Sequence, residues 1–285
     1  IPRRTEIRDE AADVKVDTTR MIPKEQVVVV VTNEGYIKRV PYRSYSSSNG
    51  EDTLLKENDY TIGMYNINTT DVMLLFTNLG NYLYLPVYDI PECKWKDLGK
   101  HISNIIPLMD NEKIVYSMFV SDFDEEKYIT SFSKNGMIKR TLLNEFKAQR
   151  YSKPIKMMNL KDDDEIVSVT DSSDSEIFIA TSCGYGLWYD VSEVPVVGIK
   201  AAGVKSINLK DDYVVSGILF NAGSEYITIL TDKGTGKRVK LLEFEKTSRA
   251  KRGILLMKVI KSNPSRVISV YIEESKSLIG IVSDN

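Results

Sequence analysis

The sequence predicts an all-β protein built from repeated hairpins, and three observations support this fold class. The first is a run of five valines at residues 27–31, because branching at Cβ disfavours helix and suits a pleated sheet. The second is the Asn33-Glu34-Gly35 sequence that follows, which is typical of a type I turn closed by a glycine with positive φ. The third is that the same hairpin pattern returns along the chain.

The repeated unit consists of an apolar strand, Thr or Ser, two turn residues, a glycine and a second strand. Its turn glycines are Gly35, Gly80, Gly136, Gly184 and Gly234, at spacings of 45, 56, 48 and 50 residues. A sixth copy begins at residues 278–285. Repeats of this period indicate the blades of a propeller-like array.

One array of blades accounts for nearly the whole length, so we expect a single domain at residues 27–285 after a lead-in strand or arm at residues 1–26. The repeats span residues 27–71, 72–127, 128–176, 177–225 and 226–276, with a partial sixth at 277–285. Each repeat has two further apolar segments, which predicts four strands per repeat and about six blades in all. Helix is expected only as a short turn within residues 142–149.

The chain starts without Met and ends within a repeat, so we expect a fragment of a longer polypeptide. The sequence does not determine whether the blades close into a ring.

Composition is ordinary for a soluble protein with a sizeable core, with 42% hydrophobic and 27% charged residues. No apolar run approaches the roughly 18 residues of a membrane span, and residues 1–20 carry no signal peptide. Cys93, Cys183 and His101 are too few for a disulfide framework or a structural zinc site. We therefore expect a cytoplasmic protein without a membrane as its primary partner.

Net charge is −2, but the basic residues are clustered. Residues 128–161 contain eight basic and one acidic residue, and repeat five contains 12 basic and five acidic residues. Because the repeats superpose, we expect these side chains to form one basic band that contacts DNA phosphates. The alternative is that the charges only protect strand edges from aggregation. The predicted DNA-binding residues are Lys38, Arg39, Arg43, Lys139, Arg140, Lys147, Arg150, Lys153, Lys237, Arg238, Lys240, Lys246, Arg249, Lys251 and Arg252.

No motif predicts catalysis. His101 has no evident nucleophile or carboxylate beside it, and the segment at residues 234–237 lacks the first glycine and the final Ser or Thr of a phosphate loop. The acidic run at 162–165 lacks calcium-loop spacing. An alternative function is a protein-interaction propeller that uses this run and residues 122–126, and a metabolite-binding propeller ranks third.

Several segments together resemble one family. They are VTNEGYIKRVP, SKNGMIKR, TDKGTGKRV, WKDLGKHISNIIPL and SRAKRGILLMKVI. From residue 22 onward the chain is similar to the C-terminal domain of bacterial type IIA topoisomerase A subunits. That family folds as a β-pinwheel, whose blades exchange a strand with their neighbours. The loop at residues 42–50 has one arginine and lacks the basic box of gyrase, so the resemblance is to the topoisomerase IV branch.

The resemblance implies a non-catalytic domain that binds and bends duplex DNA with little sequence preference. It implies that the domain guides DNA for strand passage, in decatenation and supercoil relaxation. It also places the strand-cleaving tyrosine outside this segment and assigns ATP and Mg²⁺ to other parts of the holoenzyme, so no cofactor is expected in this domain. The implied partners are duplex DNA, the B subunit of topoisomerase IV, and a second A subunit, in the bacterial nucleoid.

Overall fold

Five antiparallel sheets, one for each predicted hairpin, make up the protein. The computed structural model describes residues 21–161, 163–257, 262 and 264–273. The first hairpin strands are β1 (Gln26–Thr32), β4 (Val72–Thr77), β8 (Tyr128–Ser133), β12 (Glu176–Thr181) and β16 (Tyr226–Thr231). The second hairpin strands are β2 (Tyr36–Pro41), β5 (Asn81–Pro86), β9 (Met137–Leu142), β13 (Tyr185–Asp190) and β17 (Gly236–Lys240). All five turn glycines have φ between 68° and 84°, which confirms the turn predicted from the sequence.

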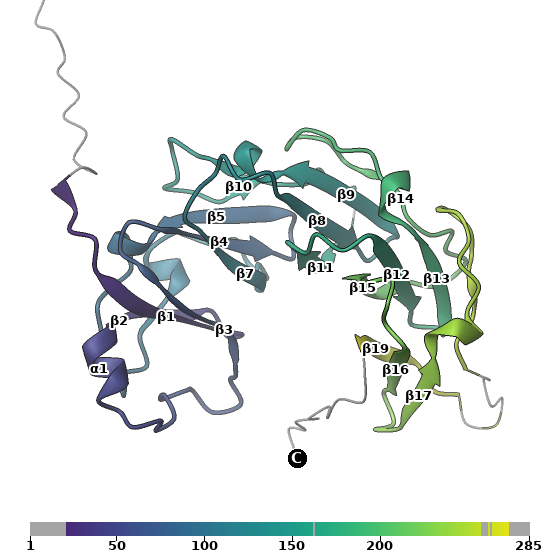
Figure 1. Cartoon of the computed structure of the whole chain (residues 1–285), viewed down its shortest axis with the longest axis horizontal. Coiled ribbons are helices and arrows are strands. Elements are labelled where there is room, and N and C mark those ends of the chain that lie inside the picture. The colour runs from purple at the N-terminus through teal and green to yellow at the C-terminus, as the bar shows by residue number, and fades with distance from the viewer. Residues whose placement is uncertain (1–20, 162, 258–261, 263, 274–285) are drawn as a thin grey trace, which may run out of the picture.

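A third strand from the same repeat pairs with the first hairpin strand of each sheet. These strands are β3 (Thr61–Asn68), β7 (Ile114–Val120), β11 (Ile166–Thr170), β15 (Val214–Phe220) and β19 (Val267–Glu273). The third strands of successive sheets adjoin one another along the inner side of an arc (Figure 1). Among the described residues this arc is open, with the first and fifth sheets at its two ends.

The fourth strand of each of the first four sheets comes from the following repeat. These exchanged strands are β6 (Lys100–His101), β10 (Ile155–Lys156), β14 (Val204–Lys205) and β18 (Ile254–Leu255). They give the sheet orders β3-β1-β2-β6, β7-β4-β5-β10, β11-β8-β9-β14 and β15-β12-β13-β18. In the described part of the chain the fifth sheet has three strands, β17-β16-β19.

Strand exchange agrees with the β-pinwheel that the resemblance implies, and repeats two to five each contain four strands, as predicted. Two segments that were predicted as strands are not: residues 52–59 form no strand, and residues 102–112 form a 3₁₀ turn after β6. An exchanged strand has only two residues and pairs with the sheet of the preceding repeat. It is too short to show a periodic pattern in the sequence. The predicted partial sixth repeat at 277–285 and most of the lead-in lie outside the described residues.

Helical structure is limited to short turns. The one α-helix of the described residues is α1 (Tyr42–Ser46), in the loop where the sequence predicted no helix. The 3₁₀ turns are η2 (Val87–Asp89), η3 (Ile102–Asn104), η4 (Leu143–Phe146), η5 (Val191–Glu193) and η6 (Leu241–Glu243). No helix in the described ranges is long and apolar enough to cross a membrane.

Separate apolar cores join each pair of neighbouring sheets. Alternate residues of the first strands face opposite ways, so Val29 packs toward the second sheet and Val30 away from it. The outward face of the first sheet is covered by Tyr45, which belongs to α1, and by Trp95. The arc is therefore a stack of sheets held by buried side chains, and its curvature follows from their packing.

Candidate nucleic-acid interface

The outer side of the arc is formed by the loops that carry each chain segment to the preceding sheet. We call these the crossing loops: residues 87–99, 143–154, 191–203 and 241–253. Three of them form a parallel bridge with the second strand of the preceding sheet, pairing Glu92 with Arg39, Val196 with Arg140 and Lys246 with Trp188. Each loop then enters its exchanged strand at the outermost position of that sheet (Figure 1). The exposed side chains of these loops are consequently on the convex side of the arc, whereas their buried side chains belong to the cores between sheets.

Ten of the 15 predicted cationic residues are exposed, and two of them, Arg238 and Lys246, form ion pairs. The ten side chains come from the crossing loops of repeats three and five, from β17 and from α1. The other eight are Lys147, Arg150, Lys153, Lys251, Arg252, Lys237, Lys240 and Arg43. Of these, Arg252 stacks over the Tyr185 ring, with 4.2 Å between the guanidinium carbon and the ring centroid.

Lys38 and Lys139 are buried, which corrects their prediction as DNA ligands. They are 2% and 1% exposed. The Lys38 ammonium donates to the Trp95 and Asp97 carbonyl oxygens at 2.7 and 2.5 Å. The Lys139 ammonium donates to the Met157 carbonyl and, at 2.5 Å, to the Ile199 carbonyl. Burial lowers the pKa of both groups, that of Lys139 to about 8.

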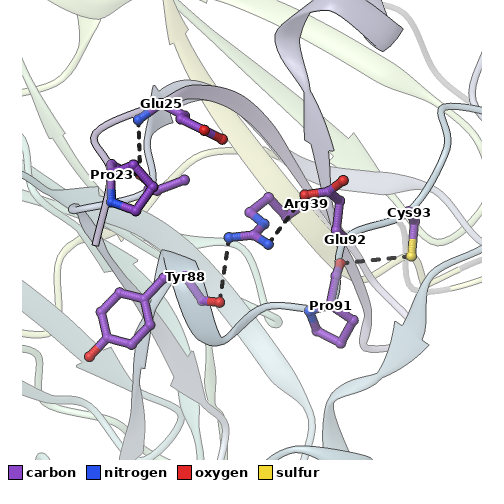
Figure 2. A network of polar contacts seen from close by, with 8 residues as sticks. Pro23, Glu25, Arg39, Tyr88, Pro91, Glu92 and Cys93 are labelled. Carbon is purple, nitrogen blue, oxygen red and sulfur yellow. Dashed lines mark hydrogen bonds and ion pairs between the residues drawn. The ribbon is translucent and has the colours of Figure 1, made fainter. Parts of the chain in front are cut away.

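Three predicted arginines contact their own or a neighbouring blade. Arg39 donates to the Tyr88 carbonyl and to the Glu92 carboxylate, each at 3.4 Å (Figure 2). Arg140 lies 4.0 Å above the Tyr128 ring centroid. Arg238 forms an ion pair with Glu273 at 2.8 Å and stacks on Tyr226 at 4.1 Å. These contacts hold the guanidinium groups against the protein. Arg39 and Arg140 are also half-buried, so they are less available to phosphates than the exposed side chains, whereas Arg238 is exposed.

Lys246 and Arg249 attach the last crossing loop to the fourth sheet and to η5. Lys246 pairs with Glu176 at 2.7 Å and with Asp190 at 3.1 Å. Hydrogen bonds from Ser192, and then from Lys246, lower the pKa of Asp190 to about 2. Arg249 donates from its backbone N–H to the Glu193 carboxylate at 2.8 Å and from its side chain to the Glu193 carbonyl at 3.0 Å.

Sequence reasoning missed the lysines of the exchanged strands. Lys100, Lys156 and Lys205 occupy β6, β10 and β14 and are exposed on the outermost strands of the first three sheets. A signal was available, because three of the four exchanged strands follow a glycine with positive φ, Gly99, Gly203 or Gly253. With the exposed cations of the crossing loops, these lysines define the outer track: Lys100, Lys147, Arg150, Lys153, Lys156, Lys205, Lys251 and Arg252.

The acidic turns have mixed structural roles. Asp164 is buried and its carboxylate accepts hydrogen bonds from the backbone N–H groups of Asn135 and Glu165, at 2.8 and 2.9 Å. Asp122 accepts one from the Asp124 N–H at 2.8 Å. Asp162 lies outside the described residues. No group of three or more potential metal ligands occurs among the residues that the structure describes.

The segments that match a known protein family coincide with the five repeats. The family model described as "DNA gyrase C-terminal domain, beta-propeller" matches residues 26–50, 71–121, 127–171, 175–221 and 225–272. The A subunit of DNA topoisomerase 4 from Bacillus subtilis is 46% identical over 271 residues, which are 94% of this chain and 34% of that protein. Its counterpart from Staphylococcus epidermidis is 39% identical over 94% of this chain and 34% of its own length. The chain thus spans about a third of these relatives.

Two solved structures share the fold. The crystal structure of the C-terminal domain of DNA topoisomerase IV has a TM-score of 0.85 and 48% identity, covering 88% of this chain and 79% of its own. The E. coli ParC C-terminal domain has a TM-score of 0.69 at 16% identity, covering 87% of this chain and 99% of its own, and it supports the fold alone. The chain therefore belongs to the DNA gyrase C-terminal domain family of β-propellers, in its pinwheel form, and is similar to the C-terminal domain of the topoisomerase IV A subunit.

Proposed function

We propose that this domain binds duplex DNA along the outer track and bends it around the arc, as an accessory domain of the topoisomerase IV A subunit. The observation that carries the proposal is the outer track itself. The residues that carry its cations span more than 150 positions in sequence, and the crossing loops and exchanged strands that contain them lie on the outer side of the arc (Figure 1). A convex row of ammonium and guanidinium groups suits a curved line of phosphates.

Bending follows from the shape of the arc. Smoothly bending about 20–30 bp by 40–90° costs on the order of 1–6 kcal/mol, and phosphate contacts distributed along a curved edge offset this cost. These contacts are to the DNA backbone, so binding has little sequence preference. In the proposed role the domain guides duplex DNA for strand passage, in decatenation and relaxation of supercoils.

Catalysis belongs to the rest of the holoenzyme in this proposal. The domain contributes no catalytic residue and no cofactor, while ATP, Mg²⁺ and the cleaving tyrosine act elsewhere. The proposed protein partners are the B subunit of topoisomerase IV, together with a second A subunit, in the bacterial cytoplasm at the nucleoid.

A salt titration tests the proposal. Fluorescence anisotropy of a labelled duplex of about 30 bp gives the affinity of the chain between about 50 and 200 mM salt, and log K falls with log salt by about 0.9 for each phosphate contacted. The double variant Lys251→Glu with Arg252→Glu weakens binding to all duplexes alike.

Lys113→Glu is the matched control, because this exposed lysine precedes β7 on the inner side of the arc. We expect the Lys113→Glu variant to bind the duplex with the wild-type affinity. A salt-independent affinity, or equal losses in the control and in the double variant, contradicts the proposal.

A further inference from the structure

A pocket of about 400 Å³ opens between the second sheet and the crossing loop of repeat three. Tyr84 of β5, Tyr88 of η2 and Tyr151 of the crossing loop line it. The rest of the lining consists of Val72, Pro86 and Ala148, with Thr70 before β4 and Ile22 of the lead-in. Its volume lies within the roughly 300–1,000 Å³ of small-molecule sites. Neither the hairpin fold nor the phosphate contacts of the outer track account for this pocket.

The three tyrosines form a connected aromatic wall. The Tyr84 ring stacks on Phe123, with 5.7 Å between centroids and 18° between planes, and lies 5.2 Å from the Tyr151 ring. Burial, and then a hydrogen bond with Tyr151, raise the pKa of Tyr88. Tyr84 is therefore packed between two rings and buried, whereas Tyr88 and Tyr151 are half-buried.

Three cations lie in the same loop as part of this wall. The crossing loop that supplies Ala148 and Tyr151 also carries Lys147, Arg150 and Lys153, all exposed. Asp89 follows Tyr88 in the chain, and its carboxylate interacts with the Arg39 guanidinium. Aromatic faces between backbone-binding cations are the arrangement with which proteins hold bases of single-stranded nucleic acid.

We propose that this pocket holds an unpaired nucleobase of a DNA strand whose phosphates contact Lys147, Arg150 and Lys153. The inference rests on the proposed DNA-binding function and adds a ligand that duplex binding does not require. A bent duplex presents such a base at a gap or mismatch, where little stacking has to be broken. The domain accordingly favours DNA interrupted at the site of the bend.

Photo-crosslinking tests the pocket on the unmodified chain. The probe is a duplex of about 30 bp with a short single-stranded gap in which each thymine is replaced by 5-iodouracil, a base that crosslinks to aromatic rings stacked on it. Mass spectrometry of the crosslinked peptides locates the attachment at Tyr84, Tyr88 or Tyr151. A crosslink confined to aromatic residues outside the pocket overturns the proposal.

Affinity provides the second readout. The chain binds the gapped duplex about 5-fold or more tightly than the intact one, and Tyr151→Ala removes this preference because one stacked base is lost. Tyr151→Phe retains the ring and the preference. Tyr213→Ala, at an exposed tyrosine before β15, is the control and leaves the preference unchanged.

The outcomes separate the two proposals. Equal affinities of the wild-type chain for gapped and intact duplex overturn the base pocket while leaving duplex binding in place. Failure to bind either DNA overturns the proposed function together with the pocket.

Discussion

At the scale of single residues, one position of the second hairpin strands alternates between lysine and leucine. Lysine occupies it in the first, third and fifth sheets, and leucine in the second and fourth. The residues are Lys38, Leu83, Lys139, Leu187 and Lys237. Lys38 and Lys139 are buried by carbonyl groups of incoming segments, whereas Lys237 is exposed on β17, to which no exchanged strand is added in the described part of the chain. The same residue type therefore has a structural role in two sheets and a surface role in the third.

Replacing Lys139 tests its structural role. Lys139→Met leaves the Met157 and Ile199 carbonyls without their donor and lowers the free energy of unfolding by about 1–3 kcal/mol. Urea unfolding followed by circular dichroism measures the loss. Lys147→Met, at an exposed lysine of the next loop, changes stability by less than about 0.5 kcal/mol. Equal effects of the two substitutions would show that Lys139 contributes no structural contact.

The pH dependence of this effect has a defined sign. The pKa of Lys139 is about 8 in the folded chain and 10.5 as its ordinary value. Between these values the unfolded chain binds more protons, so the wild type gains stability relative to Lys139→Met as pH rises from 8 to 10.5. Unfolding of both proteins at a series of pH values gives this difference. A difference that is constant across that window would contradict the lowered pKa.

At the scale of the elements, the exchanged strand and its glycine determine how neighbouring blades join. Gly203 has a φ of +82°, and a Cβ there would lie 2.4 Å from the Ile138 carbonyl oxygen. Gly99 and Gly253 make the same close approach to the preceding sheet. The glycine therefore brings the incoming chain close enough for β14 to pair with β9.

A pair of glycine substitutions separates the close approach from backbone strain. Gly203→Ala suffers both, whereas Gly50 has a φ of +80° with nothing within 4 Å, so Gly50→Ala suffers the strain alone. We expect Gly50→Ala to cost about 1 kcal/mol and Gly203→Ala at least twice as much. Thermal melts of the two variants provide the comparison. Equal shifts in Tm would exclude steric contact as the reason for glycine at position 203.

The last crossing loop contains Lys246, which attaches the loop to the fourth sheet, and Lys251 and Arg252, which we propose contact DNA. Substitutions in this loop can distinguish the two roles. Lys246→Ala leaves the carboxylate of Glu176, a residue that is 5% exposed, without its ammonium partner. It lowers Tm by an amount corresponding to about 1–3 kcal/mol. DNA affinity, compared at a temperature where both proteins are folded, falls less than for the Lys251→Glu and Arg252→Glu double variant. The opposite ranking would place Lys246 among the DNA ligands.

The sequence predicted the elements better than the surface. Alternation and turn chemistry are local, so the five hairpins and their positive-φ glycines were predicted correctly from residues within each repeat. Burial of Lys38 and Lys139 depends on carbonyl groups up to 60 residues away. Lys156 and Lys205 were missed because two-residue strands have no periodicity, and their outer position follows only from the exchange. The aromatic pocket is lined by Tyr84 of repeat two and Tyr151 of repeat three. No pattern within one repeat could therefore have predicted it.

At the scale of the whole molecule, strand exchange turns a linear array of hairpins into a curved body with a continuous convex edge (Figure 1). Third strands line the inner side, and crossing loops with their cations line the outer side. Net charge of −2 conceals this division, because acidic residues at other sites balance the outer track. Shape and charge therefore coincide on one edge, which is the physical basis of the proposed DNA bending.

Energy transfer between dyes at the two ends of a duplex of about 40 bp tests this coincidence most directly, because bending shortens the distance between the ends. The wild-type chain raises the transfer efficiency at saturation. A variant with Lys153, Lys156, Lys251 and Arg252 changed to Glu fails to raise it at any concentration. Wild-type binding without a change in efficiency, or an unchanged rise with the charge-reversed variant, would contradict DNA bending along the outer track.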